Sequence, residues 1–121
     1  PHPPPLVHSF PPRRSSDLNR GVGVAKYTGS RGKGGSNDAN AEFVAQVRKI
    51  FDDNGVIWQI GELGKVDQGG GGTVALDISR LNADVIDVGV PVLSMHSPFE
   101  VVSKLDVYMA YKAFKAYFLA E

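Results

Sequence analysis

SNDANAEFVAQVRKIFDDNGVIWQI, residues 36–60, is the stretch that decides the fold class. Its apolar residues recur at the i, i+4 and i+7 spacing of one helix face, which predicts an amphipathic helix. Asn54-Gly55 supplies a C-terminal stop, because glycine adopts the left-handed conformation without a steric penalty. Residues 56–60 then read as a buried strand. The helix face consists of Phe43, Val44, Val47, Ile50 and Phe51, and Ser36, Asn37 and Asp38 offer capping side chains at its start.

The segments on either side alternate between strand-like and helix-like patterns. Upstream, residues 22–27 form a short strand candidate that ends in the glycine-rich loop 29–35. Downstream, a helix is expected over 73–81, followed by two β-rich runs within 83–94 that Gly89 and Pro91 divide. The pattern is that of an α/β protein.

The last predicted helix is placed by Ser97-Pro98-Phe99-Glu100, which has the form of a capping box. In such a box Ser97 accepts from the first-turn amides, and Glu100 reaches back to the cap. We therefore expect a helix to begin there and to run to the end of the chain. Its expected inner face comprises Val102, Leu105, Met109, Ala113 and Ala116, with Lys104, Lys112 and Lys115 pointing outward.

Composition limits the class of protein. The 121 residues suit about one domain, and 13 Lys plus Arg balance 13 Asp plus Glu. This balance gives no long-range attraction to nucleic acid or to anionic lipid, and no apolar run approaches the roughly 20 residues of a membrane span. The absence of cysteine excludes disulfides and thiolate metal sites and fits a cytoplasmic protein.

Residues 1–20 form a proline-rich segment that is set apart from the rest, since six of the eight prolines fall in the first twelve residues. One interpretation is a disordered, polyproline-like tail. The favoured one is an artefact, because RSSDL at 14–18 is what a common sequencing-adapter end encodes in one frame. His2 and His8 are therefore discounted as ligands. On this interpretation the native chain was cut upstream and the protein is a fragment.

The glycines at 69–72 mark a loop that needs a bare backbone, because ordering four glycines carries a large entropic cost. Close approach to a substrate is one explanation, and a flexible surface loop is the other. Nucleotide binding is disfavoured, because neither phosphate-binding glycine motif is complete.

His96 falls where a predicted strand ends, and ligands collect at the carboxyl ends of strands in open α/β sheets. Taken alone, a single histidine is better explained by a hydrogen-bonded junction residue than by a metal ligand. Glu100 is likewise explained more simply as a capping residue than as a catalytic acid.

Five motifs together resemble the family of aspartyl aminopeptidase and vacuolar aminopeptidase I, and its bacterial members most. They are KYTGSRGK at 26–33, SNDAN at 36–40, WQIGELGKVD at 58–67, GGGGT at 69–73 and LSMHSPFE at 93–100. The resemblance runs almost continuously over residues 21–121. The tetrahedral glutamyl and deblocking aminopeptidases share a similar ending and are the nearest confusable relatives.

The resemblance implies that residues 21–121 are the C-terminal portion of a catalytic domain of the zinc-exopeptidase type. Its fold would be a three-layer mixed α/β sheet flanked by helices. His96 would bind one of two zinc ions, while the other ligands and the general-base glutamate would lie upstream. Lys26 would line the substrate pocket, and the pocket wall would include Asp67, Gly70, Gly71 and Gly72.

The function implied is removal of N-terminal residues from peptides by a cytoplasmic homo-oligomer, with acidic and neutral residues as the open alternatives for the residue removed. The 121-residue chain alone is expected to be inactive, because most ligands and the base are absent. Neither nucleic acid nor membrane is an expected partner. The alternative is a small non-catalytic α/β binding or scaffold module, which would need a closed core of its own.

Overall fold

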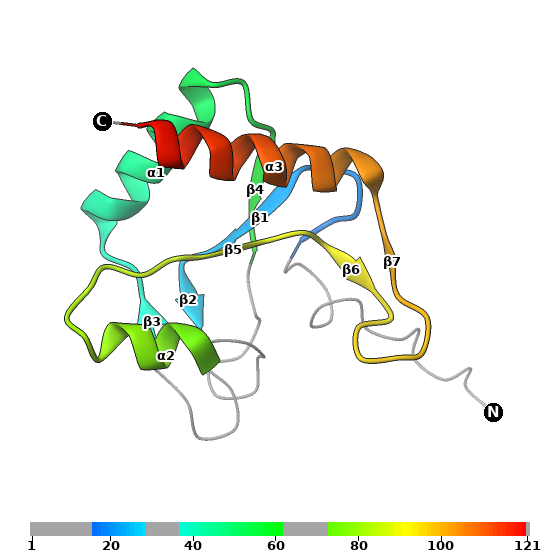
Figure 1. Ribbon diagram of the computed structural model, residues 1–121, viewed down its shortest axis with the longest axis horizontal. Coiled ribbons are helices and arrows are strands. Elements are labelled where there is room, and N and C mark those ends of the chain that lie inside the picture. Colours follow the sequence, from blue (N-terminus) through cyan, green and yellow to red (C-terminus); the bar gives the residue numbers. More distant parts are fainter. Residues whose placement is uncertain (1–15, 29–36, 62–72, 121) are drawn as a thin grey trace.

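The computed structural model describes residues 16–28, 37–61 and 73–120, and a three-stranded mixed sheet lies at its centre (Figure 1). The sheet contains β1 (Val22–Ala25), β4 (Trp58–Ile60) and β5 (Asp87–Gly89), in the order β4-β1-β5. β1 runs parallel to β4 with Val22 opposite Trp58, and antiparallel to β5 with Val24 opposite Val88. β1 is therefore the only one of these strands that is paired on both sides among the described residues.

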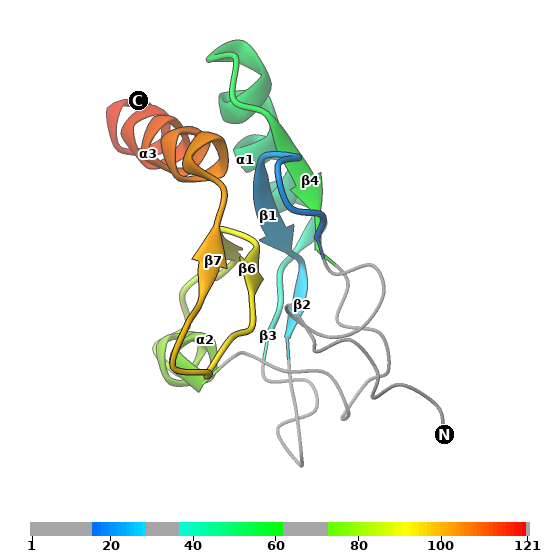
Figure 2. The same ribbon diagram turned by 90° about the vertical axis from the view of Figure 1, so that its right-hand side faces the viewer.

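Three helices and two further strand pairs surround this sheet. The helices are α1 (Ala41–Asp53), α2 (Thr73–Ser79) and α3 (Lys104–Leu119). The strand pairs are antiparallel: β2 (Tyr27–Thr28) with β3 (Asn37–Asp38), and β6 (Val92–Leu93) with β7 (Val101–Val102). Figures 1 and 2 show α1 and α3 at one end of the molecule, and β2, β3 and α2 at the other. None of the described helices is long and apolar enough to cross a membrane.

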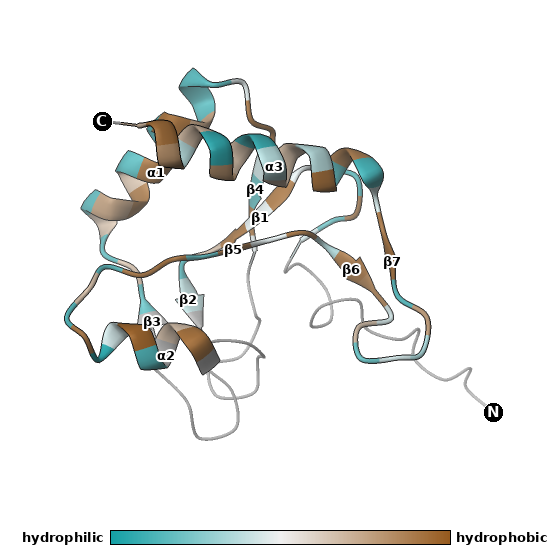
Figure 3. Cartoon of the chain, in the orientation of Figure 1, coloured by the Kyte–Doolittle hydropathy of each residue, from teal (hydrophilic) through white to brown (hydrophobic). Residues whose placement is uncertain are grey.

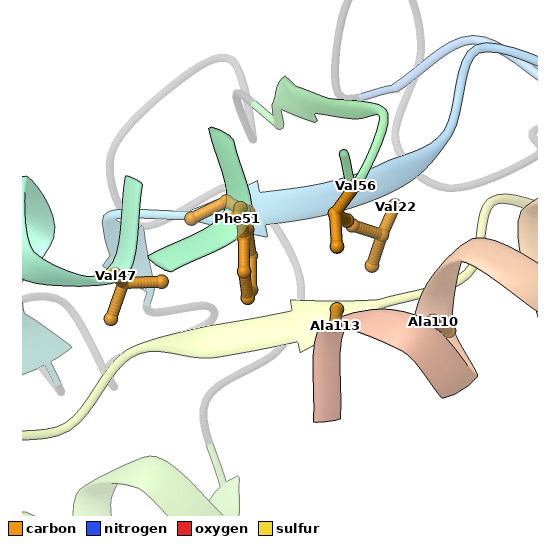
Figure 4. Packing of buried hydrophobic residues seen from close by; sticks show 7 residues of the cluster. Val22, Val47, Phe51, Val56, Ala110 and Ala113 are labelled. Carbon is orange, nitrogen blue, oxygen red and sulfur yellow. The ribbon is translucent and has the colours of Figure 1, made fainter. Parts of the chain in front are cut away.

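The core forms where α1 and α3 pack on one face of β1. Val22 and Val24 lie on the same face, because side chains two apart in a strand point the same way, and both are buried. They meet Phe51 of α1 and Ala113 of α3 (Figure 4). Burial of a side chain such as Phe51 contributes about 1.5–3 kcal/mol. Small alanines on α3 let that helix approach closely.

The mixed α/β class is confirmed, but the expected three layers are not seen in this part of the chain. α1 and α3 share one face of the sheet. On β1 the side chains alternate between faces, and a Cβ added to Gly23 would lie 3.3 Å from Cβ of Ser16. The segment at Ser16 thus lies where a second helical layer was expected.

The helix predicted within 36–60 is confirmed, but its cap is Asn40 rather than Ser36, Asn37 or Asp38. The Asn40 side chain accepts a hydrogen bond from the Phe43 N–H at 2.7 Å. Residues 37–38 form β3 instead, because their backbones pair with β2. Gly55 has φ of 63° and terminates the helix as predicted.

The strand predicted over 56–60 is shorter and less buried than expected. β4 begins at Trp58, and Val56 is buried, but Ile57 and Ile60 are exposed. β4 pairs only with β1 among the described strands, so one of its edges has no neighbouring strand there to cover it.

The predicted start of the last helix is wrong, since α3 begins at Lys104 with Ser103 as N-cap. Val101 and Val102 form β7, because β-branched residues suit a ladder, and they pair with Leu93 and Val92. The predicted inner face is correct at Ala113 and Ala116 but wrong at Val102 and Leu105, which are exposed. The prediction for Lys112 is also wrong: its Nζ atom donates to the Gly55 carbonyl at 2.9 Å.

A buried carboxylate joins the first described residues to α3. Asp106 is 1% exposed, and its oxygens accept from the backbone N–H groups of Asn19 at 2.6 Å and Gly21 at 2.8 Å. Gly21 has φ of 91°, and a Cβ there would lie 2.2 Å from the Ile57 carbonyl oxygen. Only glycine fits this close approach.

Large apolar side chains also remain exposed along α3. They include Leu105, Tyr108, Tyr111, Phe114 and Phe118. Figure 3 shows that hydrophobic and hydrophilic residues alternate along this helix.

Candidate functional site

The carboxyl ends of β1 and β4 meet at one edge of the sheet, because the two strands are parallel. Lys26 directly follows β1, and Gly61 directly follows β4. Figures 1 and 2 show the loop between β6 and β7 on that same side of the molecule, opposite α3. Ligands of open α/β sheets bind at this kind of edge.

The loop that carries His96 connects the two strands of the β6–β7 pair, not a strand and a helix. Ser94 has φ of 58° and His96 has φ of 68°, so both residues are left-handed. This conformation costs a non-glycine residue roughly 1–2 kcal/mol. The Ser97 N–H donates to the Ser94 carbonyl at 3.0 Å, which closes a tight turn around His96.

Ser97 and Glu100 hold this loop instead of capping a helix. The Glu100 carboxylate accepts the His96 N–H at 2.5 Å. The Ser97 hydroxyl lies 2.6 Å from the Ser94 carbonyl and 2.5 Å from the Phe99 carbonyl, and its single proton serves one of them at a time. Glu100 therefore does accept a hydrogen bond from an earlier backbone N–H, as predicted. The donor, however, lies in a turn between two strands and not at the start of a helix.

The imidazole of His96 is exposed, and no described residue forms a hydrogen bond with it. A neutral imidazole in this state can donate one nitrogen to a metal such as zinc. The described residues contain no group of three His, Cys, Asp or Glu side chains that could hold a metal ion. Within the part of the chain that is described, His96 could therefore supply at most a single ligand.

Lys26 lies at the sheet edge and forms an ion pair with Asp38 of the neighbouring strand β3. The two side chains are 47% and 59% exposed, so solvent screens the pair. The backbone carbonyl of Lys26 accepts from the Ala39 N–H at 2.8 Å, which fixes the chain at this point. Asp67, Gly70, Gly71 and Gly72 lie outside the described residues, so their place beside Lys26 and His96 stays a prediction.

Sequence reasoning missed a carboxylate beside an apolar cavity of about 340 Å³ between α1, β5 and α3. Phe43, Phe51, Val88 and Phe114 line this cavity together with Asp87. Burial raises the pKa of Asp87, and its Oδ2 atom has no hydrogen-bond partner among the described residues. The sequence feature that could have indicated this buried carboxylate is the position of Asp87 within an apolar, β-rich run. The cavity contains none of the predicted site residues.

Comparison with known proteins adds a family match. Residues 3–118 match the family model described as aminopeptidase I zinc metalloprotease (M18). A probable M18 family aminopeptidase of Thermotoga maritima is 56% identical over 99 residues, which cover 82% of this chain and 22% of that protein. The chain therefore spans about a fifth of the length of that relative.

Solved structures agree with this match. The crystal structure of aminopeptidase I from Clostridium acetobutylicum matches this chain with a TM-score of 0.80 and 46% sequence identity. The matched region covers 98% of this chain and 26% of the Clostridium chain. A chain solved as a dodecamer has a TM-score of 0.65, with 99% of this chain and 31% of that chain covered; at 21% identity this likeness concerns the fold alone.

Proposed function

Because the chain belongs to the aminopeptidase I zinc metalloprotease (M18) family, we propose that it forms part of the catalytic domain of a two-zinc aminopeptidase. The proposed activity is removal of N-terminal residues, preferentially acidic ones, from peptides. The observation that carries the proposal is His96, whose exposed imidazole is unpaired among the described residues. Its loop between β6 and β7 lies on the side of the molecule opposite α3 (Figure 1).

The residues of this chain would take two roles in that reaction. His96 would give one neutral nitrogen to a zinc ion, and the loop would keep this side chain in place through bonds to its own backbone. Bound zinc would polarise the scissile carbonyl and lower the pKa of a coordinated water. The remaining ligands and the general base would come from outside the described residues.

Lys26 would bind an acidic side chain of the substrate. Its ammonium group is paired with Asp38, but an exposed ion pair contributes only about 0–1 kcal/mol. A substrate carboxylate could therefore displace Asp38 at little cost. Asp67 and the glycines at 70–72 would complete the pocket wall. A cytoplasmic location and a homo-oligomeric state of the whole protein belong to the same proposal.

The test uses a hybrid in which this chain replaces the matching segment of the Thermotoga maritima relative. His96→Ala should lower the bound zinc and reduce kcat for an aminoacyl-anilide by at least about a hundredfold, since a missing ligand removes metal chemistry. Phe99→Ala is the matched control in the same loop, because Phe99 is 86% exposed. Retention of full zinc content by His96→Ala would show that this histidine is not a ligand.

Two further measurements separate substrate choice from catalysis. In the hybrid, Lys26→Ala should raise KM for Asp- and Glu-anilides while leaving neutral substrates unchanged. The 121-residue chain alone should show no turnover at any zinc concentration. Measurable turnover by the chain alone would contradict the proposal that most of the catalytic groups lie elsewhere.

A further inference from the structure

The backbone of His96 is in a conformation that needs support from its neighbours. With φ of 68°, His96 lies in the left-handed region, which histidine visits more readily than most residues but which remains unfavourable. Ser94, two residues earlier, is left-handed as well. The β6–β7 pairs at Leu93–Val101 and Val92–Val102 fix the ends of this loop but not its middle.

The contact that reaches the middle of the loop comes from Glu100. Its Oε1 atom accepts the His96 N–H at 2.5 Å, and a hydrogen bond to an ionised acceptor is stronger than one between neutral groups. Glu100 directly precedes β7, so the strand pairing anchors it. The helix-capping role that its spacing suggests is excluded, because α3 begins at Lys104.

We propose that Glu100 is a positioning residue for His96: its carboxylate holds the His96 N–H and so keeps the left-handed turn that presents the imidazole for metal binding. The inference rests on the proposed function, since it takes His96 to be a zinc ligand. Hydrogen bonds that orient a metal ligand typically change affinity by about 10–100-fold when they are removed. Ser97 adds a second tie through its hydroxyl.

The first experiment tests the geometry without any metal. In the 15N-labelled 121-residue chain, His96 should give a strong intraresidue HN–Hα NOE, because a positive φ brings these hydrogens close together. Glu100→Ala should weaken that NOE and speed exchange of the His96 amide by about ten- to hundredfold. Glu100→Gln keeps a side-chain carbonyl acceptor and should retain most of the protection.

Glu42→Ala is the matched control, because it removes an equal charge from the exposed first turn of α1. It should leave the His96 amide unchanged, while amide signals of Val22 and Phe51 report that the core is intact in each variant. An unchanged His96 NOE and exchange rate in Glu100→Ala would overturn the inference.

The second experiment measures zinc itself, by titrating Zn²⁺ into the metal-free hybrid described above. Glu100→Ala should weaken zinc binding by about 10–100-fold, and Glu100→Gln should stay close to the native hybrid. If Glu100→Gln loses zinc as fully as Glu100→Ala does, Glu100 acts as a ligand and the positioning role is wrong.

The failure of the inference can be told apart from the failure of the proposed function. If His96→Ala loses zinc while Glu100→Ala keeps native affinity, the positioning role is overturned and the function stands. If His96→Ala keeps its zinc, the proposed function fails, and with it the role assigned to Glu100 in metal binding.

Discussion

Asp106→Ala should be the most destabilising of the single substitutions considered, because it leaves two backbone donors without their acceptor. The Asp106 carboxylate is 1% exposed and accepts from Asn19 and Gly21 at 2.6 and 2.8 Å. Hydrogen bonds to a charged group contribute about 1.5–3 kcal/mol each. Part of that gain offsets the desolvation of the carboxylate, so we expect a loss of about 3–5 kcal/mol in the free energy of unfolding.

Asp106→Asn provides a graded second measurement. The amide keeps one carbonyl acceptor, but its NH2 group faces the other backbone N–H, so one hydrogen bond is lost. We expect about half the effect of the alanine substitution. Asp53→Ala is the matched control, since Asp53 is an exposed partner of Lys49 and should leave the midpoint close to native.

The assay is urea unfolding followed by fluorescence of Trp58, the only tryptophan, and by far-UV circular dichroism. With an m-value of about 1–3 kcal/mol/M, a loss of about 3 kcal/mol lowers the midpoint by roughly 1–3 M. Equal midpoints for the native chain and Asp106→Ala would refute the view that this carboxylate holds the segment at 19–21 against α3.

Three further predictions concern other parts of the molecule. Gly21→Ala should destabilise by at least about 2 kcal/mol, because its Cβ would overlap the Ile57 carbonyl, whereas Gly89→Ala has open space and should be neutral in the same unfolding assay. Burial raises the pKa of Asp87, because the folded state disfavours the charged carboxylate. The stability that the neutral form of Asp87 contributes is therefore fully present below pH 3.8 and is lost as pH rises through the folded-state pKa. Asp87→Asn should therefore gain stability on the native chain between pH 4 and 7, and a pH-independent difference would contradict this. The isolated chain should self-associate in analytical ultracentrifugation through the exposed apolar side chains of α3, and the double variant Leu105→Ser/Phe118→Ser should self-associate less. A strictly monomeric chain would instead favour the small scaffold module.

Local periodicity was sufficient to predict α1 and its end at Gly55, because the signal lies within one helix. It failed at the start of α3, where the sequence offers two Ser-x-x-acid patterns, at 97–100 and at 103–106. The second of them marks the start of the helix, with Ser103 as N-cap and Asp106 in the first turn. What decides between them is the pairing of Val101 and Val102 with β6, a contact that lies outside either pattern.

The buried role of Asp106 could not be predicted from the sequence for a similar reason. Asp106 shares a helix face with Ala110 and Ala113, but an aspartate at the start of a helix ordinarily suits the exposed first turn. Its partners lie 85 and 87 residues away. At His96 the residues alone left two explanations open, and the family resemblance favoured a ligand; that resemblance is confirmed by the match, while the ligand role stays a prediction.

The bond from Asp106 to Gly21 also bears on how the chain folds during synthesis. β1 is made before its core partners Ala110 and Ala113 and before its antiparallel partner β5. Such distant contacts form slowly, since the intervening chain must first be ordered. α1 can cover part of Val22 and Val24 earlier, but the part that packs against Ala110 and Ala113 must remain uncovered until α3 has left the exit tunnel. A nascent chain paused before α3 should be a substrate for chaperones, and it should lose that interaction once α3 is released.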